Sequence, residues 1–435
     1  MDLSLLFDLL NKRCNYAVLR NYELLPRECG RDIDMLIDRK DFFAERPIII
    51  DFFVEKGYKL FQYYKGSEMH SLVFAKVCDG DVDLVSFDFL FSIYVRDLVL
   101  FNSKEVLAYR KYTGQIYIVR EDFEFLSKYL YNRALKEGYP DKYSNIQKIA
   151  FEKYKNDISK ILVDIFGTEK LDYKDDDGKN IIRYCWNKHL ATQIKSLFTY
   201  FISTLSNVFC PQGISISFTG PDGVGKTTVI DKIILQLQNL YKNIPLFHFR
   251  PLLIGNLGEV AHNVGLKKEV DREYTKPHRG RKVGVISSLL RLCYYTIDYI
   301  LGYYKLVKGK LFRRNIVIFD RYYTDVICDS RRSRIFLNYK FLYWFGRIFI
   351  PNLDYNILLT AGTETILGRK QELTREGIEM INDKIDYLTT KKGYKKVMNE
   401  GTVEEAVKEM EFTAESVGNN ADASVEKTVE DGVMR

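Results

Sequence analysis

The run from Ile214 to Thr228, ISISFTGPDGVGKTT, limits the possible folds of this chain more than any other stretch. An alternating apolar segment leads into Gly220–Thr227, which has the form G-x-x-x-x-G-K-[ST], and a helical pattern follows it. Glycines allow a tight turn that brings backbone N–H groups against phosphate oxygens, and a helix that begins there adds positive potential. The sequence therefore predicts a phosphate-binding loop between a strand and a helix.

The side chains of this loop predict how it would hold a nucleotide. Lys226 is long enough to reach the β- and γ-phosphates, and the hydroxyl of Thr227 is placed to ligate Mg²⁺. The residues expected to contact the nucleotide are Gly220, Asp222, Gly223, Val224, Gly225, Lys226, Thr227 and Thr228.

Size and composition restrict the class of protein. The 435 residues exceed one ordinary core and predict two or three domains. The net charge of +7 is small for this length and suits anionic small molecules, so no nucleic-acid partner is expected. The seven cysteines are widely spaced without a C-x-x-C pair, which favours free thiols in a reducing cytoplasm. The N-terminus is unlike a signal peptide and no apolar run reaches about eighteen residues, so a cytoplasmic protein without a membrane span is expected.

The apolar patterning divides the chain into three segments and a tail. Residues 1–95 are predicted to form a small α/β domain, 96–205 a helical segment, 210–411 an α/β domain and 412–435 a disordered tail. Two apolar, aromatic-rich stretches, Leu197–Phe209 and Leu289–Val307, have helical periodicity and are expected to face a core or a domain interface. Short apolar runs suited to buried parallel strands lie at Ile214–Phe218, Leu246–Phe249, Ile316–Phe319 and Asn356–Leu359.

Charged residues come directly after two of these expected strands. Arg250 follows the second run, and Asp320 and Arg321 follow the third. Because ligands bind at the carboxyl ends of parallel strands, we expect these residues beside Gly220–Thr228. Cations and one carboxylate around bound phosphates suit phosphoryl transfer, whose catalysis rests on positioning and charge neutralisation.

Four segments together resemble the thymidylate kinase family: Gly220–Thr228, Arg250-Pro251, Asp320-Arg321-Tyr322 and Arg369-Lys370. The resemblance covers residues 210–411 and implies a P-loop NTPase domain, with a parallel sheet flanked by helices. It implies ATP and Mg²⁺ as cofactors and phosphoryl transfer to a nucleoside monophosphate such as dTMP, or to a related small metabolite. By the same analogy the protein would be a homodimer.

The resemblance also implies roles for single residues. Asp222 would face the sugar or phosphate of the acceptor, and Arg250 and Arg321 would hold the acceptor phosphate. Asp320 would organise Mg²⁺ together with Thr227. The implied catalytic residues are Lys226, Asp222, Arg250, Asp320, Arg321 and Arg369.

Two further segments carry implied roles in this family. Arg369 would belong to a mobile lid over the transferring phosphate, and Met398–Gly401 would contact the base of the donor. Other features differ from dedicated thymidylate kinases: Arg250-Pro251 lacks the usual neighbouring acid and glycines, and residues 265–282 are rich in Lys, Arg and Glu. An extra basic pair, Arg331-Arg332, is expected on a solvated face. The whole pattern resembles the thymidylate-kinase-like proteins of bacterial surface-polysaccharide clusters.

The amino-terminal segment carries a second candidate site. Asp32 and Asp34 lie two positions apart on an expected strand, so both carboxylates share one face. Convergent carboxylates repel unless a cation lies between them, which makes a divalent metal their natural partner. Asp83, from a neighbouring expected strand, would be the third ligand, with Asp81 as an alternative on the same face. The trio resembles the nucleotidyltransferase superfamily, which implies two Mg²⁺ ions.

Three functions remain open on this evidence. The leading one is an ATP- and Mg²⁺-dependent kinase acting on a small-molecule acceptor. The alternative is a nucleotidyltransferase that uses Asp32, Asp34 and Asp83, with the P-loop domain as a coupled or regulatory activity. Against it, Arg20-Asn21 stands where that superfamily has a Gly-Ser or Gly-Gly turn, so the N-terminal domain could be a non-catalytic scaffold. The third is a non-catalytic interaction protein that uses nucleotide binding as a switch.

Overall fold

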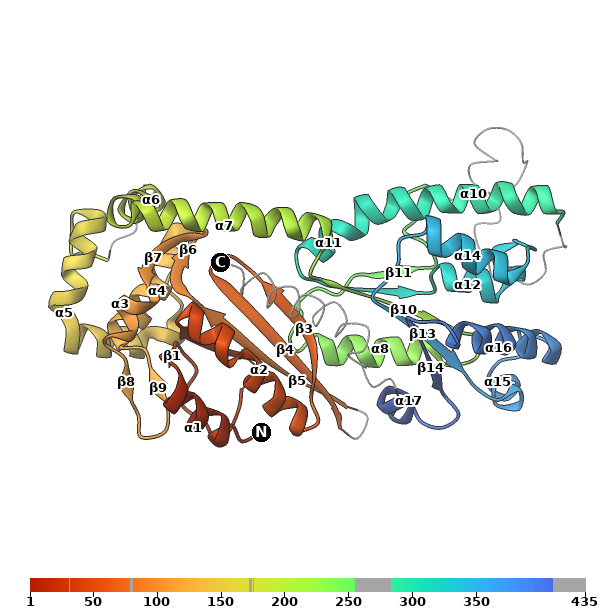
Figure 1. Ribbon diagram of the computed structural model, residues 1–435, viewed down its shortest axis with the longest axis horizontal. Helices are drawn as coiled ribbons and strands as arrows, with labels where there is room; N and C mark the ends of the chain where they lie inside the picture. Colours follow the sequence, from red (N-terminus) through yellow and green to blue (C-terminus); the bar gives the residue numbers. More distant parts are fainter. Residues whose placement is uncertain (31, 79–80, 172–173, 175, 255–282, 410–435) are drawn as a thin grey trace. The chain divides into compact units, whose positions relative to one another are not determined.

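The chain folds into two compact units. The computed structural model describes residues 1–30, 32–78, 81–171, 174, 176–254 and 283–409 (Figure 1). Unit 1 comprises Met1–Phe74 and Leu84–Cys210, and unit 2 comprises Ala75–Asp83 and Pro211–Arg435. The tail predicted at 412–435 and the basic segment at 265–282 lie outside the described residues. Among the described helices, none combines the length and apolarity needed to cross a membrane.

A seven-stranded sheet with strand order β3-β4-β5-β2-β1-β9-β8 organises the first part of the chain. The strands β2 and β5 run parallel, whereas β1 pairs antiparallel with β2. The strands of this sheet are β1 (Tyr16–Val18), β2 (Asp32–Ile37), β3 (Lys59–Lys65), β4 (Met69–Cys78), β5 (Asp81–Leu90), β8 (Lys111–Tyr112) and β9 (Tyr117–Ile118). A separate hairpin is formed by β6 (Ser92–Val95) and β7 (Leu98–Asn102).

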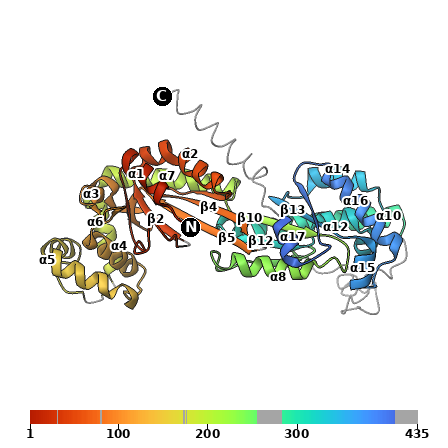
Figure 2. The same ribbon diagram turned by 90° about the horizontal axis from the view of Figure 1, so that it is seen from below.

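The two faces of β2 meet different surroundings because side chains alternate along a strand. Ile33, Met35 and Ile37 pack into a core with α1 (Ser4–Arg13) and α2 (Arg39–Glu55). Leu36 faces the other way and packs into a second core that includes α4 (Glu121–Ala134). Figures 1 and 2 show α1 and α2 on one side of the sheet and α4 on the other. Asp32 and Asp34 lie four and two positions before Leu36 and therefore share its side of the sheet, toward α4.

The remaining helices of unit 1 extend the second core. They are α3 (Ser103–Leu107), the 3₁₀ turn η1 (Asp141–Tyr143), α5 (Ser144–Phe166), α6 (Asp177–Lys188) and α7 (Leu190–Phe209). The expectation that Leu197–Phe209 faces a core is wrong: in α7 the buried residues are the polar Gln193, Ser196 and Asn207. Gln193 accepts a hydrogen bond from Val99 N–H at 2.9 Å and donates to Val99 C=O at 2.7 Å. Polar side chains therefore attach this helix, and its apolar residues lie outward.

Unit 2 is built on a five-stranded sheet with order β11-β12-β10-β13-β14, in which every neighbouring pair is parallel. The expected apolar runs form β10 (Ile214–Thr219), β11 (Leu246–His248), β12 (Ile316–Asp320) and β13 (Tyr355–Thr360), and β14 (Tyr394–Met398) adds an edge. All residues of β10 are buried, as a strand covered on both faces requires. The described chain is thus mixed α/β, with a parallel sheet flanked by helices in unit 2.

The strand order creates a natural binding position at the end of β10. The chain places β11 and β12 on one side of β10, and β13 and β14 on the other. Ligands bind in the crevice that forms at such a reversal, outside the carboxyl ends of the strands. The flanking helices are α8 (Lys226–Leu237), α10 (Val285–Gly302), the π-helical η3 (Tyr303–Val307), α11 (Lys308–Phe312), α12 (Tyr323–Cys328), α13 (Ser330–Ser333), α14 (Tyr339–Phe349), α15 (Thr363–Arg369), α16 (Arg375–Thr389) and α17 (Val403–Glu409).

Candidate functional site

The glycine-rich loop Gly220–Thr227 lies at the strand reversal, between β10 and α8. Gly223 and Gly225 have φ angles of 88° and 90°, a conformation that favours glycine over residues with a Cβ. At Gly220 a Cβ would lie 2.3 Å from the carbonyl oxygen of Leu359, so only glycine allows β10 and β13 to approach this closely. The Asn399 side chain donates to the carbonyl of Val224 at 2.7 Å. The loop is therefore held from the β14 side as well as by its own glycines.

Lys226 begins α8 and is buried, with 6% of its surface exposed. Its Nζ donates to the carbonyl oxygens of Gly220 and Pro221, both at 2.9 Å. Burial, followed by the positive charge of Arg321, lowers the pKa of Lys226 to about 7. The amine thus loses most of its charge just above neutral pH in the free protein, and a bound polyanion would restore that charge.

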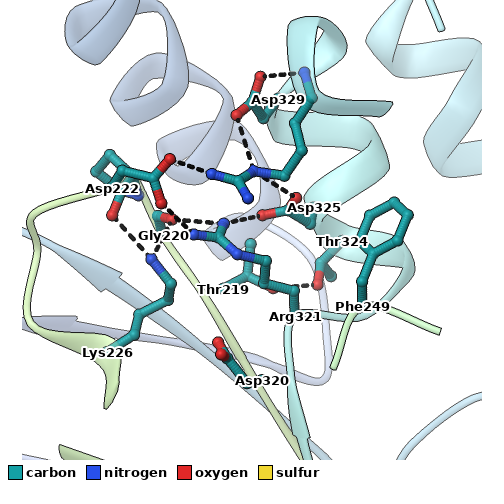
Figure 3. A network of polar contacts seen from close by, with 12 residues as sticks. Thr219, Gly220, Asp222, Lys226, Phe249, Asp320, Arg321, Thr324, Asp325 and Asp329 are labelled. Atoms are coloured by element: carbon teal, nitrogen blue, oxygen red, sulfur yellow. Dashed lines mark hydrogen bonds and ion pairs between the residues drawn. The ribbon is translucent and has the colours of Figure 1, made fainter. Parts of the chain in front are cut away.

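Asp222 joins the loop to the end of β12 through two arginines (Figure 3). One of its carboxylate oxygens accepts from Arg321 and the other from Arg332. Arg321 also donates to Asp325 at 2.6 Å and to the carbonyl of Gly220 at 3.3 Å. Its backbone has a φ of 74°, which is rare for a residue with a side chain. Burial lowers the pKa of Arg321, but the charges of Asp325 and Asp222 raise it more, so this guanidinium stays charged.

Arg332 lies in the short helix α13, which Asp329 caps. Asp329 accepts hydrogen bonds from the backbone N–H groups of Arg331 and Arg332 at 3.1 and 3.0 Å. The Nε of Arg332 lies 3.6 Å from Asp329 and 3.8 Å from Asp325. The expectation of a solvated face is therefore correct for Arg331, which is exposed, and wrong for Arg332.

Asp320 ends β12 and has the properties of a metal ligand. Its Oδ2 lies 3.2 Å from Nδ1 of His248, and its Oδ1 is buried without a hydrogen-bond partner among the described residues. A buried carboxylate oxygen without a partner is unfavourable unless a cation or water satisfies it. The hydroxyl of Thr227 is exposed in the first turn of α8. Carboxylate and hydroxyl oxygens suit Mg²⁺, so this donor set fits the expected ion.

Arg250 follows β11 and Arg369 lies near Gly225, and each has partners that the sequence did not predict. Arg250 is buried and donates to Asp298 of α10 at 3.0 Å, with its guanidinium 4.7 Å from the centroid of the Tyr295 ring. Arg369 donates to the carbonyl of Asn399 at 2.8 Å, with longer contacts to those of Glu400 and Gly401. These carbonyls hold Arg369 against the segment after β14, and its place in a lid stays a prediction.

A second cluster of carboxylates forms in unit 1. Ligand atoms of Asp32, Asp34 and Asp88 all lie within 4.8 Å of one another. The strand register explains this set, because Asp34 on β2 is paired with Asp88 on β5. Desolvation, with smaller contributions from the charges of Asp34 and Asp88, raises the pKa of Asp32 to about 7. Arg20 donates to Asp34 at 2.5 Å and supplies one compensating positive charge.

The third carboxylate expected from the sequence was Asp83, and this expectation is wrong. Asp83 and its alternative Asp81 lie at odd-numbered positions of β5, on the side of Phe87, which packs into the core under α2. Asp88 lies at an even-numbered position and so faces the same way as Asp34. The sequence pattern located the two strands but not their register, which decides the third ligand.

Asp325, Arg332, Asn399 and Asp88 therefore belong to the two sites, although the sequence did not assign them these roles. The only local signal was the spacing of Asp325 and Asp329 after Arg321, which puts their side chains on one side of a helical turn. The other contacts join residues more than eighty positions apart or depend on strand register.

No protein-family model and no curated protein matches this chain. Among solved structures, the thymidylate kinase from Ehrlichia chaffeensis is similar over 44% of this chain and 89% of its own, with 17% identity and a TM-score of 0.31. A similarity at this level does not establish a shared activity.

The cluster of Asp32, Asp34 and Asp88 predicts a site for a divalent cation, and the strand register identifies Asp88 as the third ligand. We expect Mn²⁺ to bind at pH 8 and the Asp88→Asn variant to weaken binding about tenfold or more, because one charged ligand is lost. Asp83→Asn is the matched control on the same strand and should bind as the parent does. Binding should also weaken about fivefold between pH 7 and pH 6, because protonation of Asp32 competes with the metal below its pKa of about 7. Electron paramagnetic resonance of free Mn²⁺ measures each affinity, and equal loss in both variants would contradict the assignment.

Proposed function

We propose that unit 2 is a P-loop kinase that transfers the γ-phosphoryl group of ATP to a small-molecule acceptor with the help of Mg²⁺. The observation that carries this proposal is the convergence of Lys226, Asp222, Arg321 and Asp320 at the strand reversal of a parallel sheet. Phosphoryl transfer needs cations, a metal ligand and backbone N–H groups around one point, and little other chemistry from the protein. These groups meet that requirement.

Each residue has a distinct task in this proposal. The loop amides and Lys226 bind the phosphates of ATP, and Lys226 exchanges its present carbonyl partners for phosphate oxygens. Mg²⁺, held by Asp320 and Thr227, would neutralise charge on the phosphates when bound. Asp222 faces the acceptor, while Arg321 and Arg332 fix its orientation. Arg369 holds the segment after β14, beside which the donor base would lie.

The sequence favours a nucleoside monophosphate such as dTMP, or a related small metabolite, as the acceptor. The same resemblance supports a homodimer and the surface-polysaccharide type of thymidylate-kinase-like protein, both of which belong to this proposal. Neither bears on the chemistry at the loop, which depends on residues of one unit.

Replacing Lys226 tests the kinase proposal directly. We expect Lys226→Ala to abolish ATP turnover above background while the protein stays folded, because the buried amine is the loop's own cation. Lys242→Ala, at an exposed lysine after α8, is the matched control and should keep parental turnover. ADP release is measured with Mg²⁺ and a panel of nucleoside monophosphates. ATP binding without any turnover would instead support a nucleotide-dependent switch.

The pH dependence of ATP binding provides an independent test of the role of Lys226. The pKa of Lys226 is about 7 in the free protein, and bound phosphates favour the charged amine, so binding at pH 8 should take up close to one proton. Uptake should fall toward zero as the pH decreases below 7, where the free amine is already charged. Calorimetry in two buffers with different heats of ionisation measures this uptake. Persistence of the uptake in Lys226→Ala would show that another group is responsible.

Replacing Arg332 tests the contribution of the two arginines that bind Asp222. Loss of a charge-assisted hydrogen bond of roughly 2 kcal/mol should lower kcat of Arg332→Ala by about tenfold or more, with ATP affinity unchanged. Arg331→Ala, one position earlier and exposed, should behave as the parent. Steady-state kinetics with separate ATP titrations distinguish the two effects. Equal kcat values for the two variants would remove Arg332 from the site.

A second candidate function is nucleotidyl transfer by unit 1, and the cluster of Asp32, Asp34 and Asp88 favours it. Three carboxylates on one sheet face are the ligands that such a reaction uses for Mg²⁺. We expect pyrophosphate release from nucleoside triphosphates that is lost in Asp88→Asn and retained in Lys226→Ala. Pyrophosphate release that is insensitive to Asp88 would exclude this activity for unit 1.

A further inference from the structure

The helix α7 lies against β7 with its polar side chains turned toward unit 1 (Figure 1). Gln193 accepts a hydrogen bond from the backbone N–H of Val99 and donates one to the carbonyl of the same residue. The hydroxyl of Ser196 lies 2.9 Å from both the carboxylate of Glu68 and the carbonyl of Asp97. These contacts fix the rotation of α7 about its own axis, so they also determine which side chains face outward.

Apolar side chains occupy the outward face of α7 along its whole length. Phe198, Phe201 and Phe209 are 65%, 63% and 72% exposed, and they recur at the spacing of one helix face. The other large apolar side chains of this face are Leu190, Ile194, Leu197, Ile202, Leu205 and Val208. At 1.5 Å per residue the face is about 30 Å long. A continuous apolar surface of this extent is typical of a site that binds a protein or a membrane.

The charge of this part of the chain is complementary to an anionic surface. Residues 178–221 include no Asp or Glu, and their basic residues are Lys179, Arg183, Lys188 and Lys195. Lys179 and Lys188 form ion pairs, whereas Arg183 and Lys195 are exposed and have no carboxylate partner among the described residues. The outward face of α7 is therefore accompanied by positive charge and by no acidic residue of its own.

Lys195 lies at the border of the apolar face. It is seven positions, or about two helical turns, before Ile202, so both side chains are on the same side of α7. A lysine in this position can lay its methylenes along an apolar layer and keep its ammonium group in the polar layer above it. Near anionic lipids, one such charge strengthens binding about fivefold.

Unit 2 has a helix with the same combination of features. The exposed apolar side chains along one face of α10 and η3 are Ile286, Leu290, Ile297, Leu301 and Tyr304. The basic residues that follow them are Lys305, Lys308, Lys310, Arg313 and Arg314. The one acidic residue between Gly284 and Phe319 is Asp298, whose side chain is fully buried. An exposed apolar face beside basic residues thus occurs in each unit.

A lipid bilayer accounts for both helices with a single partner. It presents an apolar interior and a charged surface everywhere, so it needs no separate complementary site for each unit. Two copies of this chain that paired α7 with α7, or α10 with α10, would bring together faces that have basic residues and no exposed carboxylates. An anionic membrane is the partner that matches these helices in both polarity and charge.

We propose that α7 binds the surface of a membrane that contains anionic lipids, with its apolar face among the acyl chains and Lys195 among the headgroups. The helix α10 makes a second contact of the same kind. Binding of this type needs no helix that crosses the bilayer, and none of the described helices is long and apolar enough to do so. The contact is separate from both candidate active sites, and it does not depend on the reaction proposed for either.

Sedimentation of the full chain with lipid vesicles tests the proposal. Vesicles of phosphatidylcholine with about one third phosphatidylglycerol are compared with vesicles of phosphatidylcholine alone. We expect binding that is at least about tenfold stronger to the anionic vesicles and that weakens as the salt concentration rises from about 0.01 M to about 1 M, because salt screens the charges. Absent binding to the anionic vesicles, or equal binding to the two kinds, overturns the proposal.

The double variant Phe198→Gln/Phe201→Gln tests the apolar face. Both side chains are exposed, so the variant should unfold at the parental temperature, and it should bind anionic vesicles at least about tenfold more weakly because less apolar surface enters the acyl layer. The matched control is Leu5→Gln/Leu24→Gln, which replaces two side chains of unit 1 that are 67% and 65% exposed and lie outside α7. It should bind as the parent does. Equal affinities of the two double variants contradict the role given to α7.

The variant Lys195→Gln tests the contribution of charge. It should weaken binding to anionic vesicles about fivefold. Lys160→Gln, at an exposed lysine of α5, is the control and should keep the parental affinity. If both lysine variants bind equally, Lys195 has no part in the contact.

Sedimentation velocity without lipid tests whether a second copy covers α7 instead. A parent that is a monomer, or a dimer that Phe198→Gln/Phe201→Gln leaves intact, keeps the face of α7 available to lipid and supports the proposal. A parental dimer that this variant converts to a monomer shows that the second copy occupies the face, and it overturns the assignment to a membrane.

Discussion

The Asp222 carboxylate, shared between Arg321 and Arg332, is the contact on which the arrangement at the sheet edge depends. It ties the glycine-rich loop to Arg321 after β12 and to Arg332 of α13. Arg321 can make this contact because its backbone adopts a φ of 74° and turns the side chain back over Gly220. Strain of this kind persists where surrounding contacts determine it, and here the buried Asp325 supplies the opposing charge.

The same network sets the electrostatics of the loop. Arg321 lies close enough to lower the pKa of Lys226, after burial has already lowered it. The free protein therefore keeps its phosphate-binding amine poorly charged and bonded to two carbonyls of its own loop. A nucleotide would bring the negative charge that Lys226 lacks and would release those carbonyls. A bound nucleotide would thus change the charge of Lys226, while Arg321 and Arg332 beside it are paired with Asp222.

The parts of the site that the sequence predicted are those encoded in short stretches. Gly220–Thr227 specifies its own turn, because its glycines permit φ angles and backbone approaches that other residues do not. Asp320 and Arg321 follow from the apolar run before them, since a buried strand must end where charges begin. The outer strand β14 was missed, because its lysines give it a weak apolar signal at the edge of the sheet.

The parts that the sequence did not predict depend on contacts between distant segments. Asp88 takes the place expected for Asp83 because the register between β2 and β5 depends on both strands and cannot be predicted from either one alone. In the sequence, Arg332 resembles one member of an exposed basic pair. Only the direction of α13 in the structure distinguishes it from the exposed Arg331. Arg250 looked like a ligand for phosphate because nothing in its neighbourhood of the sequence reveals Asp298, forty-eight positions later.

Both candidate sites use arginine to balance carboxylates, but with opposite outcomes for the ligand. In unit 1 the guanidinium of Arg20 pairs with Asp34, while ligand atoms of Asp32, Asp34 and Asp88 lie within 4.8 Å of one another, an arrangement that suits a divalent cation. In unit 2 Arg250, Arg321 and Arg332 are each paired with an aspartate. Lys226, which contacts two carbonyl oxygens of its own loop, has no such carboxylate contact among the hydrogen bonds of the described residues. The balance of charge within each cluster, more than the number of basic residues near it, decides which ion the site accepts.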